Sequence, residues 1–68
     1  MRKYVLLADM GKSEIFISYM KDKEIEKARK NSQGIAVICC RRTVEQALSE
    51  ARKRDGVDDW TFNDNRFE

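Results

Sequence analysis

The stretch Arg2-Lys3-Tyr4-Val5-Leu6-Leu7-Ala8-Asp9 decides the fold, because five apolar residues follow one another without an intervening polar position. A strand with one face in water alternates apolar and polar residues, whereas a short continuous apolar run is typical of a strand that is buried on both faces. We therefore expect a buried strand over residues 2–9. A chain of 68 residues has little other material with which to cover such a strand.

Two further strands are expected on either side of a charged segment. The turn Met10-Gly11-Lys12-Ser13 is followed by Glu14–Met20, in which isoleucine and tyrosine alternate with other residues, so residues 2–20 are predicted to form a hairpin. Ile35–Cys40 is the longest continuous apolar run, and Arg41-Arg42 ends it before it reaches the length of a core helix. We expect residues 35–40 to form the central strand.

Helices are predicted in two places. Lys21–Asn31 is almost entirely charged, and Ile25 and Ala28 three residues apart favour a short, mostly exposed helix, with a solvent-facing strand as the alternative. Thr43-Val44-Glu45-Gln46 matches a capping box, in which the threonine and glutamine side chains satisfy free backbone N–H groups. An apolar stripe follows it, so a second helix is expected over about residues 44–54. The stripe consists of Val44, Ala47, Leu48 and Ala51.

The C-terminal segment is expected to add a fourth strand. Over Val57–Asn63, Asp58, Trp60 and Phe62 alternate with Asp59, Thr61 and Asn63, as in an edge strand that carries two large aromatic side chains. Asn31-Ser32-Gln33-Gly34 is predicted to be a turn. We interpret residues 1–63 as a single domain and residues 64–68 as a polar tail.

These elements predict a small α/β protein with the order ββαβαβ. Two helices hardly cover both faces of a four-stranded sheet at this length, so we expect a two-layer sandwich in which both helices pack on one face. The other face of the sheet would then expose a contiguous apolar surface, and such surfaces usually mark an interface.

The composition excludes most enzyme and metal sites. The chain has no His, three Gly and no Pro, so it lacks the commonest general base, the commonest metal ligand and glycine-rich phosphate loops. Cys39 and Cys40 are neighbours, point to opposite faces of a strand and suit no ordinary disulfide between them, which favours a reducing compartment. The sequence therefore predicts a cytoplasmic protein without catalytic residues, cofactor, metal or membrane segment.

Charge is distributed unevenly along the chain. Residues 1–54 carry a net charge of +6 and residues 55–68 a net charge of −4. The basic groups support an alternative function, nucleic-acid binding, although helix-end electrostatics already accounts for those at the end of the second helix. Aromatic residues on the sheet are expected to pack in the core rather than to stack on bases. The residues assigned to this alternative are Arg41, Arg42, Arg52, Lys53 and Arg54.

The leading interpretation is a non-enzymatic protein-interaction module. It acts either as a homodimer that hides its spare sheet face or as a stoichiometric adaptor or inhibitor of a larger protein, a size and type common among accessory proteins of phages and mobile elements. Aromatic and arginine side chains dominate binding energy at protein interfaces. The expected partner-binding residues are Arg52, Arg54, Asp58, Asp59, Trp60 and Phe62.

Overall fold

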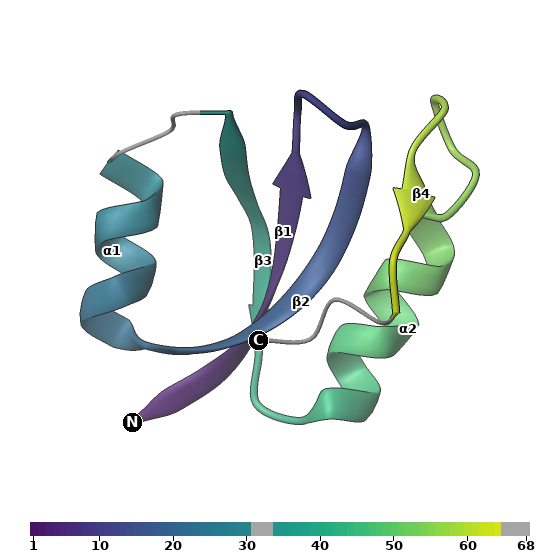
Figure 1. The fold of residues 1–68 in the computed structure, drawn as a ribbon. Helices are drawn as coiled ribbons and strands as arrows, with labels where there is room; N and C mark the ends of the chain where they lie inside the picture. The colour runs from purple at the N-terminus through teal and green to yellow at the C-terminus, as the bar shows by residue number, and fades with distance from the viewer. Residues whose placement is uncertain (31–33, 65–68) are drawn as a thin grey trace.

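The computed structural model describes residues 1–30 and 34–64 and contains a four-stranded sheet with two helices (Figure 1). The predicted α/β class and the order ββαβαβ are confirmed. Residues 31–33 of the turn expected over residues 31–34, and the tail beyond Asp64, lie outside the described residues. The elements are β1 (Arg2–Asp9), β2 (Glu14–Lys21), α1 (Asp22–Lys30), β3 (Ile35–Arg41), α2 (Val44–Arg54) and β4 (Thr61–Phe62).

The hairpin β1–β2 forms the middle of the sheet. Its strands pair antiparallel over their whole length, with Leu6 opposite Ile17, and the strand order is β3-β1-β2-β4. Val5 and Leu6 are completely buried, whereas every residue of β3 is only half-buried. The prediction that residues 35–40 form the central strand is therefore wrong. Because β1 lies between β2 and β3, it receives cover from both neighbours that an edge strand lacks.

A β-bulge in β3 sets which of its side chains share a face. Leu7 lies opposite Val37 and Leu6 lies opposite Cys39, so Ile38 is an extra residue in the ladder. Ile38 and Cys39 consequently pack against the same hydrophobic cluster, although they are consecutive. Cys40 packs against the other cluster, on the opposite face from Cys39, as the sequence indicated.

The two helices cover opposite faces of the sheet. On one face Ile25 of α1 packs with Val5 and Leu7. On the other face Ala47 and Ala51 of α2 pack in a cluster with the alternate residues of β1, Leu6 and Ala8. Figure 1 shows α1 and α2 on the two sides of the strands. The expectation that both helices share one face, and that the other face stays uncovered, is wrong.

The strand order explains why the helices separate. Strands β2 and β3 both run antiparallel to β1, and β4 runs parallel to β2, so α1 and α2 each connect two parallel strands. Such crossovers are right-handed in nearly all proteins. The crossover through α1 moves across the sheet from β2 to β3, and the crossover through α2 returns from β3 to β4. Two right-handed connections that travel in opposite directions place their helices on opposite faces.

Local sequence signals fix the helices themselves. The hydroxyl oxygen of Thr43 accepts a hydrogen bond from the backbone N–H of Gln46 (3.3 Å), which confirms the predicted N-cap of α2. Residues 22–30 form a helix and not the alternative strand, with Ile25 as its buried residue. Within residues 1–30 and 34–64, no helix is long and apolar enough to cross a lipid bilayer.

The last strand is shorter than expected. Only Thr61–Phe62 pairs with β2, and residues 55–59 form a tight turn instead of continuing the strand. Asp58 and Asp59 have φ angles of 50° and 65°, in the left-handed region that no strand residue adopts. The alternation of Asp58 with Trp60 therefore does not reflect a strand.

Replacement of Ala47 tests the packing of α2. Ala47 is fully buried, so in Ala47→Asp the carboxylate loses its hydration at a cost of several kcal/mol, a large part of the total stability of a small domain. We expect this variant to be unfolded by circular dichroism at 25 °C. The control Ser49→Asp places the same charge on the exposed side of the same helix and should change stability by less than about 0.5 kcal/mol. Equal stability of the two variants would contradict the packing described.

Candidate functional site

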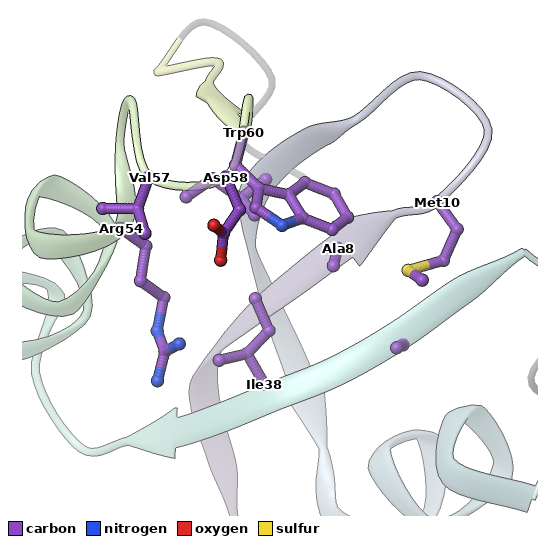
Figure 2. A pocket seen from close by; sticks show the side chains of 9 residues that line it. Ala8, Met10, Ile38, Arg54, Val57, Asp58 and Trp60 are labelled. Carbon is purple, nitrogen blue, oxygen red and sulfur yellow. The ribbon is translucent and has the colours of Figure 1, made fainter.

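A pocket of about 280 Å³ lies on the α2 face of the sheet, between β3 and the turn that follows α2 (Figure 2). The indole of Trp60 lies above Ala8, and Ile38 rises from β3 toward it. Apolar side chains from three separate parts of the chain thus form its floor and walls. The lining residues are Ala8, Met10, Ile15, Ala36, Ile38, Arg54, Val57, Asp58 and Trp60.

Backbone hydrogen bonds hold the turn at residues 54–60 that forms one wall. The N–H of Val57 donates to the carbonyl of Arg54 (3.1 Å), and the N–H of Trp60 donates to the carbonyl of Val57 (3.0 Å). The N–H of Gly56 donates back to the carbonyl of Trp60 (2.8 Å). The wall is therefore a hydrogen-bonded turn, and the pocket exists before any ligand arrives.

The opposite wall is fixed in a similar way. The backbone N–H of Met10 donates to the carbonyl of Gly34 (2.7 Å), which ties the end of β1 to the start of β3. The side chains of Met10 and Val57 are 58% and 50% exposed, so two large apolar groups stand in water at the rim. Apolar walls with a small number of polar groups are typical of binding pockets.

Two charged groups stand at the rim of this apolar pocket. Figure 2 shows the carboxylate of Asp58 between the side chains of Arg54 and Trp60. The left-handed backbone at Asp58 and Asp59 is uncommon for residues other than glycine, although aspartate tolerates it better than most. The residue with this uncommon backbone conformation, Asp58, is thus the one whose carboxylate lies at the edge of the pocket.

The outer edge of β3 adjoins the pocket. Within the described residues β3 pairs only with β1, so its other edge carries backbone groups without a strand partner. The strand is apolar from Ile35 to Cys40 and half-buried throughout. A long apolar edge strand of this kind is a template for pairing with another chain.

The structure brings together three of the six predicted partner-binding residues. Arg54, Asp58 and Trp60 line the pocket. Phe62 is half-buried against the cluster under α2, while Arg52 and Asp59 are exposed and do not line the pocket. Met10 and Val57 also line the pocket but were not predicted, although an apolar residue inside a polar turn was an available signal in both cases.

The basic residues of the nucleic-acid alternative are divided between the two ends of α2. Arg41 and Arg42 precede the helix, and residues 52–54 end it. A guanidinium nitrogen of Arg41 lies 3.6 Å from a carboxylate oxygen of Glu50, and the ammonium of Lys53 lies 3.8 Å from the same oxygen. Glu50 therefore brings Arg41 and Lys53 together from the two ends of α2 and offsets part of their positive charge.

The surroundings of the Cys39 thiol do not activate it. Burial raises the pKa of the Cys39 thiol above its ordinary value of 9.0, and the positive charge of Arg41 opposes that rise only in part. A raised pKa lowers the fraction of the reactive thiolate at neutral pH. In the described ranges, no three His, Cys, Asp or Glu side chains come together as a metal site would require.

Alkylation of Cys39 tests this environment. In a Cys40→Ala variant, Cys39 is the only thiol. We expect iodoacetamide at pH 8 to modify it more slowly in the folded protein than in the same variant unfolded by urea, because burial raises the pKa of the thiol and limits access to it. Mass spectrometry measures both rates. A faster rate in the folded protein would show that the surroundings stabilise the thiolate.

Comparison with known proteins adds no functional information: no family model, curated protein or solved structure matches the chain.

Proposed function

We propose that this protein is a binding module that captures an extended segment of another protein. The segment pairs with the free edge of β3 and places one apolar side chain in the pocket beside Trp60. The observation that carries the proposal is the position of the pocket, whose lining includes Ala36 and Ile38 of the edge strand itself.

A segment that pairs with the edge of β3 would place some of its side chains at the pocket. In a paired ladder, residues directly opposite each other place their side chains on the same face of the sheet. A segment that pairs with β3 therefore directs the residues opposite Ala36 and Ile38 toward the α2 face, where the pocket lies. In this recognition mode the main chain supplies affinity and a pocket for alternate side chains supplies specificity.

The volume of the pocket and the charge at its rim indicate which side chains the bound segment carries. Pockets for small-molecule ligands measure about 300–1,000 Å³, so the present volume of about 280 Å³ lies at the small end of that range and has room for one large side chain. The turn at residues 55–59 carries three acidic residues, Asp55, Asp58 and Asp59, against the single positive charge of Arg54, which also lines the pocket. We infer that the bound segment has a basic residue next to its apolar anchor.

The cover on both faces of the sheet bears on whether the partner is a second copy of this chain or a different protein. Each sheet face carries a helix, so the expected reason for a homodimer, a spare apolar face, no longer applies. We propose a heterologous partner, for which the protein acts as a stoichiometric adaptor or inhibitor without catalysis. The two free cysteines support a reducing, cytoplasmic location.

Peptide selection tests the proposal directly. Random peptides displayed on phage are selected on the immobilised protein, and enriched sequences are synthesised with a fluorescent label for anisotropy measurements. We expect enriched peptides to share an apolar residue beside a basic one. Met10→Ala should weaken their binding by about fivefold or more, because Met10 is a rim residue of the pocket.

Controls separate the pocket from general effects. Met1→Ala, made in a chain with an N-terminal tag, removes an equally large side chain that is 94% exposed and does not line this pocket, and should leave affinity unchanged. Asp58→Asn, of the same shape, should reduce the preference for a basic residue. Failure to enrich any peptide, or unchanged binding by Met10→Ala, would overturn the proposal. A dimer in light scattering that enriched peptides dissociate would identify a second copy as the occupant.

A further inference from the structure

A second surface lies on the same sheet face as the pocket but at the opposite end of β1. We propose that it binds single-stranded nucleic acid by stacking bases on tyrosine and holding phosphates with basic side chains. This inference is independent of the protein partner proposed above. We call this surface the tyrosine patch; it consists of Arg2, Tyr4, Tyr19, Lys21 and Arg41.

Strand register places the five side chains together. Arg2 lies opposite Lys21, and Tyr4 lies opposite Tyr19 in the β1–β2 ladder. Tyr4 also lies opposite Arg41 in the β1–β3 ladder. Residues two apart on a strand, and residues opposite each other on paired strands, share a face of the sheet. All five residues therefore belong to the α2 face, because Tyr4 packs against the cluster under α2.

The two tyrosines form a platform. Their ring centroids are 4.7 Å apart, with the rings tilted by 33°. Tyr4 is half-buried against the core cluster and supports Tyr19, which is 42% exposed. The guanidinium carbon of Arg2 lies 5.7 Å from the centroid of the Tyr19 ring. An exposed aromatic ring that a buried ring holds in place, next to an arginine, is suited to stacking on a base.

Of the three cations in the tyrosine patch, Arg41 pairs with Glu50 (3.6 Å), whereas Arg2 and Lys21 place positive charge beside the platform without such a partner among the described residues. Like charges directly opposite each other in a ladder are unfavourable, yet Arg2 faces Lys21, and both side chains are exposed. Among the described residues neither forms a salt bridge. An anionic backbone between the two cations would relieve their repulsion, and the adjacent tyrosine would meet the attached base.

The geometry favours single strands over duplex. Bases inside a duplex are already stacked and cannot reach an aromatic side chain, whereas every unpaired base presents a face for stacking. The tyrosine patch and the pocket are separated along β1 by the distance from Tyr4 to Ala8, about 13 Å. Nucleic acid and a protein segment would thus occupy different parts of the surface.

Binding of a labelled oligonucleotide tests the inference. The probes are oligothymidylate and oligouridylate of about 15 nucleotides, measured by fluorescence anisotropy over a range of salt concentrations. We expect the wild-type protein to bind one or both at low salt, and to bind a DNA duplex of the same length more weakly. Tyr19→Ala should reduce affinity by about fivefold to a hundredfold, whereas Tyr19→Phe, which keeps the ring, should retain it.

A matched pair of lysine variants separates the patch from overall charge. Lys21→Gln should weaken binding and reduce the salt dependence by about 0.7 in the log–log slope, the amount expected for one lost phosphate contact. Lys12→Gln, an identical change at the exposed turn at the other end of the hairpin, should do neither. Circular dichroism verifies the fold of each variant. No binding at low salt, equal effects of the two lysine variants, or unchanged affinity of Tyr19→Ala would each overturn the proposal.

Discussion

The whole structure depends on the need to bury both faces of β1. Val5 and Leu7 point to one face, Leu6 and Ala8 point to the other, and all four side chains are buried. Exposure of either set to water would forfeit about 1.5–3 kcal/mol for each large side chain. The described residues form two helices, of nine and eleven residues, and each covers one face. No third helix among the described residues remains to shield β3, which is why its apolar residues stay half-buried at the edge.

Sequence reasoning was reliable where neighbours in the chain determine the outcome. Thr43 and Gln46 marked the start of α2, and the run at residues 2–9 marked β1, because caps and apolar runs are local patterns. The placement of the helices was wrong because it depends on strand order, which arises from contacts between distant segments. The strand expected over residues 57–63 was too long. The sequence alternates there as in a strand, but Asp58 and Asp59 adopt a left-handed backbone conformation that interrupts it.

In the candidate sites too, residues were predicted where local sequence was sufficient and missed where distant segments meet. Arg54, Asp58 and Trp60 were found by residue type, because arginine and large aromatic residues recur at interfaces. Ile38 could not be assigned to the same pocket, since only the bulge in β3 and the approach of the turn after α2 bring it near Trp60. The pairing of Tyr4 with Tyr19 was within reach of sequence reasoning: a four-residue turn at residues 10–13 sets this register for the hairpin. The expected core packing of the aromatic residues is confirmed for Phe16 and in part for Tyr4, Trp60 and Phe62, whereas Tyr19 is exposed.

Nuclear Overhauser effects between methyl groups test the central claim most directly, because they report which helix touches which residues of β1. The account predicts contacts from the Ile25 methyl groups to Val5 and Leu7, and contacts from the methyl group of Ala51 to Leu6 and Ala8. Neither helix should show contacts to the pair of β1 residues assigned to the other helix. Contacts from both helices to the same pair of β1 residues would place them on one face. That result would leave the other face of the sheet uncovered and would contradict the account.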